Sequence, residues 1–514
     1  MGLLGFLGFP EKGEPTRPKF VELRSAKWFI MFTVSFAAST DIFMYGLIVP
    51  VTPTALERKV GLSPDKSRSS SLILVLCTLT NLKPLPTVQT WTSILLALYS
   101  AALLAFSPVI GYVADRAESR RWPLLLGLVA LEAATALLCI GTNIGLWIAG
   151  RLFQGAAAAV VWTVGIALMV DTVGKEGLGQ AIGYVSMALS IGTMAGPLLG
   201  GVLYENGGYY SVFGLAFGLI GIDIFLRLVL IEKRHAARWI ATETKPLASI
   251  EEKGNREAAT DTITESPAPV DDSKSETLEE KPVAHSPLRQ AARLLSSYRL
   301  VVSLWGYFVI SLVLTSFDSV LPIFVEDTFG WEQTGQGLIF IPLMVPHILD
   351  PITGFIIDRY RWTPRYLTAA GFLCVVPVAT LLRLVKENTM HDKVVLCALL
   401  ALLGCCISMV MTPIVTEVFN AVQEKEDNSP NVFGRGGAMA LAFGLSNMGF
   451  AAGSLIGPFF AGFIRQNAGW GTMGWAMGLV AGVSAIPNLL FVGGWILRKP
   501  KPAAAGDQPE SETS

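Results

Sequence analysis

The sequence predicts an all-α polytopic membrane protein with twelve transmembrane helices in two pseudo-symmetric six-helix bundles. Three observations lead to this fold class. Of 514 residues, 52% are hydrophobic and only 15% are charged, whereas about 25% of the residues of a soluble protein are charged. The apolar residues are gathered in segments of about 20 residues, the length that crosses a bilayer core about 30 Å thick. Motifs of the first half also recur in the second half.

Twelve segments are long and apolar enough to span a bilayer. They are 28–51, 91–113, 122–142, 144–170, 179–203, 209–231, 299–324, 336–357, 366–386, 393–416, 436–463 and 471–496. A central stretch rich in Glu, Lys, Ser, Thr and Pro separates the sixth segment from the seventh, and such a composition predicts disorder. The predicted organisation is a cytosolic segment 1–27, a bundle 28–231 with a long outer loop 52–90, a disordered cytosolic loop 232–298, a bundle 299–496 and a cytosolic tail 497–514.

Basic residues indicate the orientation, because loops rich in Lys and Arg stay on the cytosolic side. They occur before the first segment and after even-numbered segments, as in 116–121, 233–234, 359–365 and 498–501. Both termini are therefore expected in the cytosol. The same orientation holds for the plasma membrane and for a vacuolar or vesicular membrane.

Composition excludes several classes of function. A formal net charge of −1 gives no general attraction to nucleic acid. The six cysteines form no C-x-x-C pair, so we expect neither a disulfide scaffold nor a metal site. There is no nucleophile–base pair or phosphate-binding loop either. We expect no cofactor and no enzymatic activity, so no residue is assigned a catalytic role.

The two halves contain matching sequence motifs. The run Ser107–Arg116, SPVIGYVADR, matches Asp350–Arg359, DPITGFIIDR, and G-x-x-x-G-P occurs at 192–197 and at 453–458. Parallel six-helix repeats of this kind are a transporter architecture, with the binding site between the halves near the middle of the membrane.

The repeat reveals an irregularity in the first outer loop. Pro50 and Pro108 are 58 positions apart, whereas Pro322 and Pro351, their matches in the second half, are 29 positions apart. One hypothesis is that part of 67–87 is a gene-model artefact such as a retained intron. The alternative is a genuine insertion in the loop.

Three motifs resemble those of the major facilitator superfamily. The first is the G-x-x-x-D-R-x-G-R-R loop, which implies a gate between alternative access states. The second is R-x-x-Q-G in the fourth helix, and the third is a glycine-rich fifth helix typical of antiporters, with a proline that helps it bend. The matching residues are Gly111, Asp115, Arg116 and Arg120, with a second copy at Gly354, Asp358 and Arg359; Arg151 and Gln154; and Gly192, Gly196, Pro197, Gly200 and Gly201. At the gate, we expect Asp115 to stabilise a neighbouring helix N-terminus.

The first predicted helix narrows the resemblance. Asp41 precedes Val49-Pro50-Val-Thr-Pro53, as in twelve-span drug:proton antiporters and especially the vesicular amine transporter group. The resemblance implies that this aspartate recognises an amine in that group. This chain departs from that group elsewhere: Tyr99 stands where the group has a lysine in the second helix, and Asn447 where it has an aspartate in the eleventh. Asp41 is therefore expected to bind either an amine or the proton.

Depth along the helices supports the same residues. At about 1.5 Å per residue, Asp41, Arg151 and Glu132 all fall well inside the membrane, where an ionisable group indicates function. Other charges are weaker candidates. We expect Asp171, Glu417 and Arg435 to be solvated at cytosolic ends, Asp223 and Arg227 to pair, Asp318 to lie near the outer end of its helix, and Asp350 and His347 to border the inner vestibule.

These observations predict a proton-coupled exporter of a small drug, amine or secondary metabolite, acting by alternating access. The expected partners are the substrate, protons and the lipid bilayer, and the protein is expected to be a monomer. Asp41 would bind the proton, with Glu132 as a relay and Arg151 as a tuning charge. The alternatives are a proton-coupled importer or facilitator, and a ligand sensor that does not transport.

Overall fold

The structure of the chain is a computed structural model. It describes residues 20–48, 87–117, 119–175, 177–233, 286–331, 333–360, 362–429 and 437–495, with short stretches at 51–52, 55–56, 59–60, 236 and 432–433. These residues are almost entirely helical, and none of them forms a strand. The hypothesis of an artefact within 67–87 concerns residues that, apart from Thr87, lie outside the described ranges.

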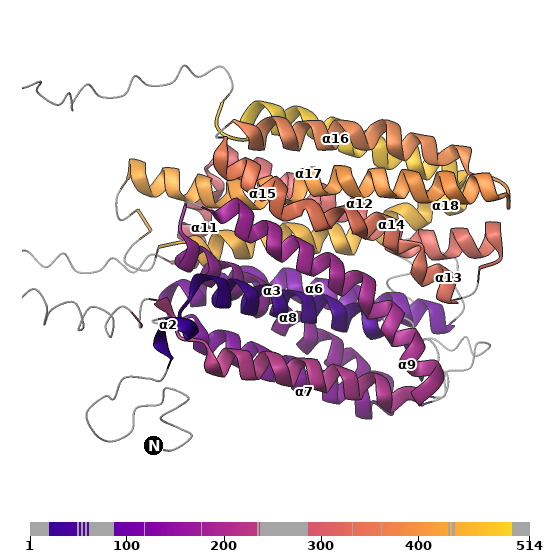
Figure 1. The fold of residues 1–514 in the computed structure, drawn as a ribbon, viewed down its shortest axis with the longest axis horizontal. Helices are drawn as coiled ribbons and strands as arrows, with labels where there is room; N and C mark the ends of the chain where they lie inside the picture. Colours follow the sequence, from indigo (N-terminus) through magenta and orange to yellow (C-terminus); the bar gives the residue numbers. More distant parts are fainter. Residues whose placement is uncertain are drawn as a thin grey trace, which may run out of the picture.

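The helices follow the predicted apolar segments closely (Figure 1). The first half comprises α2 (Val21–Arg24), α3 (Lys27–Ile48), α6 (Thr87–Arg116), α7 (Arg121–Ile140), α8 (Ile144–Val173) and α9 (Leu178–Val229). The second half comprises α11 (Pro287–Leu295), α12 (Tyr298–Phe329), α13 (Gln333–Leu338), α14 (Phe340–Met344), the 3₁₀ segment η1 (Val345–Leu349), α15 (Asp350–Arg359), α16 (Thr363–Leu381), the 3₁₀ turn η2 (Leu382–Leu384), α17 (Met390–Asn428) and α18 (Met439–Phe491).

Within the described residues, ten helical stretches are long and apolar enough to cross a membrane. Two of them, α9 and α18, have 52 and 53 residues and each reverses at a glycine with positive φ: Gly208 at φ 74° and Gly469 at φ 84°. Glycine is favoured there because other residues rarely adopt this backbone conformation. When the two arms of α9 and of α18 are counted separately, the ten stretches become twelve segments, consistent with the sequence prediction.

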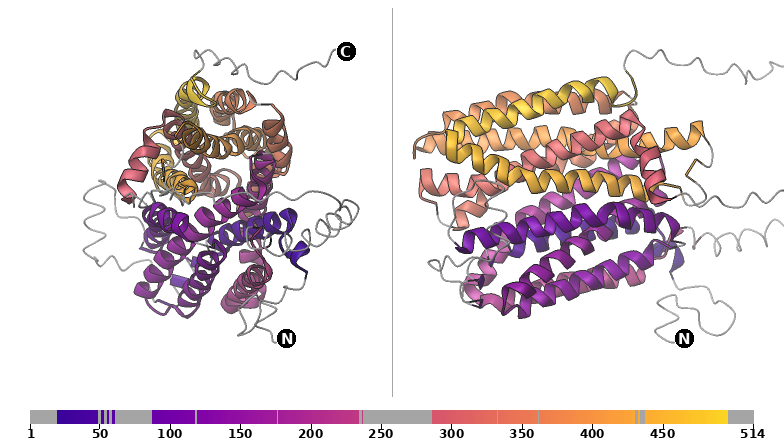
Figure 2. Two further views of the ribbon diagram at one scale, coloured as in Figure 1. Left: turned by 90° about the vertical axis from the view of Figure 1, so that its left-hand side faces the viewer. Right: turned by 180° about the vertical axis from the view of Figure 1, so that it is seen from behind.

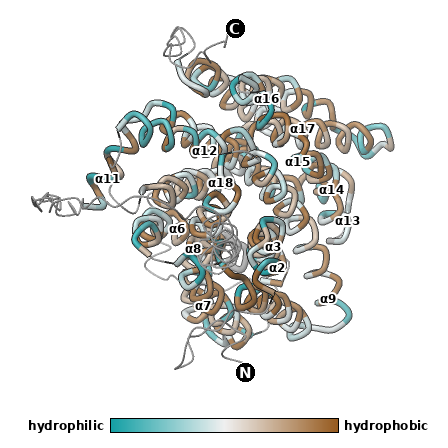
Figure 3. Tube along the Cα trace, turned by 60° about the vertical axis from the view of Figure 1, so that its left-hand side comes forward, coloured by the Kyte–Doolittle hydropathy of each residue, from teal (hydrophilic) through white to brown (hydrophobic). Residues whose placement is uncertain are grey.

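The two halves lie side by side as two groups of helices (Figure 2). They meet where α6 contacts α18 and where the first arm of α9 contacts α15. Hydrophobic residues predominate along the long helices, whereas α2 and α11 are more hydrophilic (Figure 3). Both short helices lie at one end of the bundle, which we call the α2–α11 end, and the turns of α9 and α18 lie at the opposite end (Figure 1).

The structure differs from the prediction in three places. Helix α11 lies within 232–298, the segment predicted to be a disordered loop. Helix α17 continues to Asn428, twelve residues past the predicted end of its apolar segment, because polar residues can extend a helix beyond the membrane. The eighth predicted span, 336–357, consists of α13, α14, η1 and α15 in succession rather than one regular helix.

Candidate functional site

A buried carboxylate occupies the centre of the first half. Asp41 on α3 has no solvent exposure. Its Oδ2 atom accepts hydrogen bonds from the Tyr99 hydroxyl on α6 at 3.0 Å and from Trp162 Nε1 on α8 at 2.9 Å. Its Oδ1 atom has no hydrogen-bond partner among the described residues. The site therefore holds Asp41 in place by one oxygen and leaves the second for another partner.

A buried arginine lies beside Tyr45, whose ring packs against Tyr99. Arg151 Nη1 on α8 donates to Gln154 Oε1 at 2.9 Å, while its Nε and Nη2 atoms have no hydrogen-bond partner among the described residues. The Arg151 guanidinium carbon is 5.9 Å from the Tyr45 ring centre, and the Tyr45 and Tyr99 ring centres are 5.1 Å apart. Arg151 and Asp41 thus share an aromatic neighbourhood, yet no ion pair between them is found among the described side chains.

A small, mainly apolar cavity lies between the two halves. Trp162, which binds Asp41, lines it from α8, and Ser186 lines it from α9. Tyr307 on α12 and Met411 on α17 line it from the second half. The cavity therefore lies between the halves and shares Trp162 with the Asp41 site. In transporters built of such repeats, the substrate site lies between the halves.

Two predicted site residues are not brought into this cluster. Glu132 is half-buried on α7, and it makes none of the hydrogen bonds or ion pairs found among the described residues. Asn447 on α18 instead donates from Nδ2 to Ser107 Oγ on α6 at 2.8 Å, which joins the two halves. Asp318, which was expected near the outer end of its helix, is half-buried on α12.

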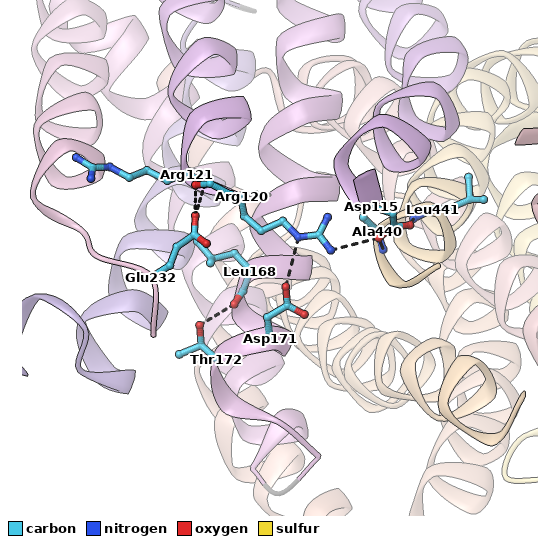
Figure 4. A network of polar contacts seen from close by, with 10 residues as sticks. Asp115, Arg120, Arg121, Leu168, Asp171, Thr172, Glu232, Ala440 and Leu441 are labelled. Carbon is cyan, nitrogen blue, oxygen red and sulfur yellow. Dashed lines mark hydrogen bonds and ion pairs between the residues drawn. The ribbon is translucent and has the colours of Figure 1, made fainter. Parts of the chain in front are cut away.

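The first predicted gating residue caps a helix of the other half. Asp115, at the end of α6, accepts hydrogen bonds from the backbone N–H groups of Ala440 and Leu441 at the start of α18, both at 2.8 Å (Figure 4). Arg120 bridges Asp115 at 3.2 Å and Asp171 at 3.3 Å. The first N–H groups of a helix lack partners within it and carry partial positive charge, so this carboxylate stabilises the contact between the halves.

The second copy of the motif makes the same contact on the other side. Asp358, at the end of α15, accepts hydrogen bonds from the backbone N–H groups of Gly179 at 2.8 Å and Gln180 at 2.9 Å, at the start of α9. Gly354 on α15 lies so close to the backbone of Gly179 that a side chain would not fit, and Gly111 on α6 is similarly close to the start of α18. Two equivalent caps therefore connect the halves at the α2–α11 end.

The motif arginines differ in their surroundings. The Arg116 guanidinium carbon lies 3.5 Å from the centre of the Tyr112 ring. Arg359 is exposed. The basic residues thus belong to the α2–α11 end, where the two aspartates make hydrogen bonds between the halves.

The glycine-rich face of α9 packs directly on the helix that carries Asp41. A Cβ atom at Gly192, Gly196 or Gly200 would lie 2.5 to 2.7 Å from a backbone carbonyl oxygen of α3. Helix α9 continues through Pro197. Gly201 differs from the other motif glycines, because a Cβ atom there would meet nothing within 4 Å. The face positions α3 against α9, and through α3 it positions the aspartate.

Two further predictions concern charges outside the cluster. Glu417 was expected to be solvated, and this is wrong: it is 1% exposed and accepts a hydrogen bond from Arg299 Nε at 2.6 Å. A basic residue distant in sequence supplies the partner that makes burial possible. Asp223 and Arg227 do pair, at 3.8 Å, and both are fully buried. No cluster of metal-ligating residues is found in the described part of the chain.

Comparison with known proteins agrees with the fold and the motifs. The family model of the Major Facilitator Superfamily matches residues 31–434. An uncharacterized MFS-type transporter of Schizosaccharomyces pombe is 31% identical over 451 residues, which cover 87% of this chain and 92% of that protein. The vesicular acetylcholine transporter of Torpedo torpedo is 23% identical over 476 residues, covering 90% and 81%.

A solved structure shows the same fold. The human organic anion transporter MFSD10 (TETRAN) superimposes with a TM-score of 0.61 at 15% sequence identity, over 90% of this chain and 99% of that one. The paired helix caps and the matched motifs fit that architecture. A family match over most of the chain, together with a full-length relative above 30% identity, leads to one conclusion: the chain belongs to the major facilitator superfamily of membrane transporters, and it is a transporter rather than an enzyme.

Proposed function

We propose that this transporter exports a small organic molecule in exchange for protons, and that Asp41 is the residue at which the two compete. The observation that supports this most directly is the fully buried carboxylate with one oxygen bound by Tyr99 and Trp162 and the other without a partner among the described residues. An ionisable side chain within the membrane is costly and commonly marks an ion or substrate pathway. Antiport requires such a group to bind a proton or the substrate, but not both.

The conformation suits one step of an export cycle. The two aspartate caps close the α2–α11 end, and we propose that this end faces the cytosol, as the basic residues predict. In that orientation the substrate site is closed to the cytosol, and protons reach it from the opposite side of the membrane. Separation of the caps would then reopen the site to the cytosol.

The neighbourhood of Asp41 favours an amphipathic substrate with a cationic group. Tyr99 and Trp162 donate hydrogen bonds to the carboxylate and Tyr45 packs against Tyr99. Aromatic rings of this kind bind organic cations well. The vesicular acetylcholine transporters among the relatives are in line with such a cation. We propose residence in the plasma membrane or a vacuolar or vesicular membrane, and a monomeric state.

Efflux from drug-sensitive cells tests the proposal. Cells expressing the chain are loaded in turn with ethidium, tetraphenylphosphonium, salicylate and a neutral dye, and efflux is followed with and without a protonophore. We expect efflux of a cation that stops with the protonophore and in Asp41→Asn. The matched control is Asp327→Asn, which removes a carboxylate from an exposed ion pair with Arg465 and should leave efflux intact.

The assay also separates the alternatives. Normal gradient-driven efflux by Asp41→Asn would refute the role of that residue. Accumulation of a probe rather than its loss would indicate an importer. Binding of a probe by the purified protein, with neither uptake nor efflux, would indicate a sensor.

A further inference from the structure

A second buried ionisable cluster lies in the other half of the molecule, away from Asp41. His347 in η1 and Asp350 at the start of α15 are 3% and 0% exposed, and their Nδ1 and Oδ2 atoms lie 3.0 Å apart. The hydroxyl of Ser408 on α17, also buried, donates to the other carboxylate oxygen of Asp350. Both oxygens of this carboxylate are therefore bound by polar groups of its own half.

The cluster lies at the contact between the halves. Helix α9 of the first half passes it at Gly183, where the backbone of Asp350 comes so close that no side chain would fit. Two turns further along α15, Asp358 caps the start of the same α9 helix. Between α14 and α15, directly before Asp350, the chain forms the 3₁₀ segment η1. Such a segment inside a helical stretch often marks a hinge.

The cluster also lies near the cavity that Trp162 lines. Ser186 and Met411 line that cavity. They lie three residues from Gly183 and Ser408 respectively, which is about one helical turn. The cavity is thus lined on one side by Trp162, which donates a hydrogen bond to Asp41. On the other side it is lined by α9 and α17, which pack against η1 and α15.

We propose that His347, Asp350 and Ser408 form a second proton-binding site, which holds a proton while the α2–α11 end is closed and releases it when α15 separates from α9. This inference rests on the proton exchange proposed above. The bound proton lies between His347 Nδ1 and Asp350 Oδ2. On opening, it passes to water at the α2–α11 end and leaves a neutral imidazole beside an ionised carboxylate.

The direction of coupling follows from burial. With one proton, the pair is neutral overall; without it, the pair is a buried negative charge, which is strongly unfavourable away from water. Histidine is suited to this exchange because its ring nitrogen can either donate or accept the shared proton. Closure therefore favours the protonated pair and opening favours proton release, so that protons move toward the α2–α11 end, opposite to the exported substrate.

In the part of the chain that the structure describes, the side chains bonded to Asp350 are His347 and Ser408. The elements packed against η1 and α15 are α9, α14, α16 and α17, and α14 carries no ionisable residue. Asp223 and Arg227 pair with each other, Glu417 pairs with Arg299, and Asp358 caps α9. The ionisable groups on these elements include Tyr184, Asp223 and Arg227 on α9, Cys374 and Arg365 on α16, Cys405, Cys406 and Glu417 on α17, and Asp358 and Arg359 on α15. None of them is among the hydrogen-bond or ion-pair partners of Asp350 found in the described residues.

A pH titration of the gate tests the proposal with protons as the only ligand. Spin labels are placed at the exposed residues Lys175, before α9, and Trp362, after α15, in full-length protein without native cysteines in lipid nanodiscs. The ratio of open to closed distances is measured against pH. Release of one proton on opening changes this ratio up to tenfold per pH unit. In Asp350→Asn, we expect the slope of the logarithm of the open-to-closed ratio against pH to fall by about one.

Two further variants make the test independent of a single substitution. In His347→Gln, Asp350 keeps one proton-binding carboxylate but loses its partner, so the slope is kept and the midpoint shifts to lower pH. Asp327→Asn, at the opposite end, should match the unsubstituted protein. Unchanged slope and midpoint in both Asp350→Asn and His347→Gln would overturn this inference alone. A gate that ignores pH in the unsubstituted protein would overturn both the inference and the proton exchange proposed above.

Discussion

Replacing Asp115 by asparagine is expected to weaken the closed α2–α11 end more than any other single-atom change at the gate. The carboxylate accepts two hydrogen bonds from the N-terminus of α18, both at 2.8 Å, and an ion pair from Arg120 at 3.2 Å. It is only 6% exposed. Asparagine keeps one acceptor oxygen, and its amide group cannot accept from the second N–H.

The size of the effect follows from these contacts. Loss of one hydrogen bond to a charged group costs about 1.5–3 kcal/mol. Loss of the negative charge beside a helix N-terminus costs about 0.3–1 kcal/mol more, and up to ~2 kcal/mol where the site is partly buried. A total of about 3 kcal/mol would shift the closed-to-open ratio about 100-fold, at about 1.4 kcal/mol for each factor of ten.

Electron–electron distances between spin labels at Ala117 and Asp427 would measure this ratio, because the two residues lie at the ends of α6 and α17 beside the cap. The matched variant is Asp358→Asn, whose carboxylate also accepts two backbone hydrogen bonds but has no arginine ion pair among the described residues. Its shift should be in the same direction and smaller. An unchanged distance distribution in folded, inserted Asp115→Asn would refute the reasoning.

Three further predictions concern packing and charge. Gly354→Ala would force α15 away from the start of α9. Cysteine labelling at the α2–α11 end should then show an open gate even at low pH, and unchanged labelling would contradict this. Gly192→Ala would set a Cβ atom 2.5 Å from an α3 carbonyl oxygen, whereas Gly201→Ala meets nothing, so only the first should lower the unfolding temperature in detergent. Glu417→Gln breaks a buried ion pair with Arg299, so it should destabilise the fold by about 3 kcal/mol. Glu424 is half-exposed and also pairs with Arg299, so Glu424→Gln should cost less than about 1 kcal/mol. Thermal unfolding of both variants checks this difference.

Most of the fold could be predicted from the sequence because a bilayer imposes one length on each apolar segment. Helix α3, for example, begins at Lys27 and ends at Ile48, within three residues of the predicted 28–51. Where other forces decide, the prediction was less complete. Helix α17 runs on to Asn428 through polar residues, and the 3₁₀ segment around His347 depends on packing that hydropathy does not report.

The candidate site was predictable as residues but not as contacts. The position of Asp41 in a predicted helix indicated a buried ionisable group, yet its partners Tyr99 and Trp162 come from two other helices. The same limit explains the wrong expectation for Glu417, whose partner Arg299 lies more than a hundred positions away. Depth along one helix does not give the rotation of that helix, so the depth of Glu132 gave no information about the contacts of its half-buried side chain.

The two aspartate caps have a consequence for how the protein can change over time. Each carboxylate binds backbone N–H groups rather than side chains, and every residue except proline supplies such a group. Substitutions at Leu441 or Gln180 can therefore accumulate without removing the bonds that hold the halves together. Selection on these contacts therefore acts on the acidic residue in each half and on the glycines that let the helices approach, such as Gly111, Gly179 and Gly354, rather than on the side chains whose backbone N–H groups are bound.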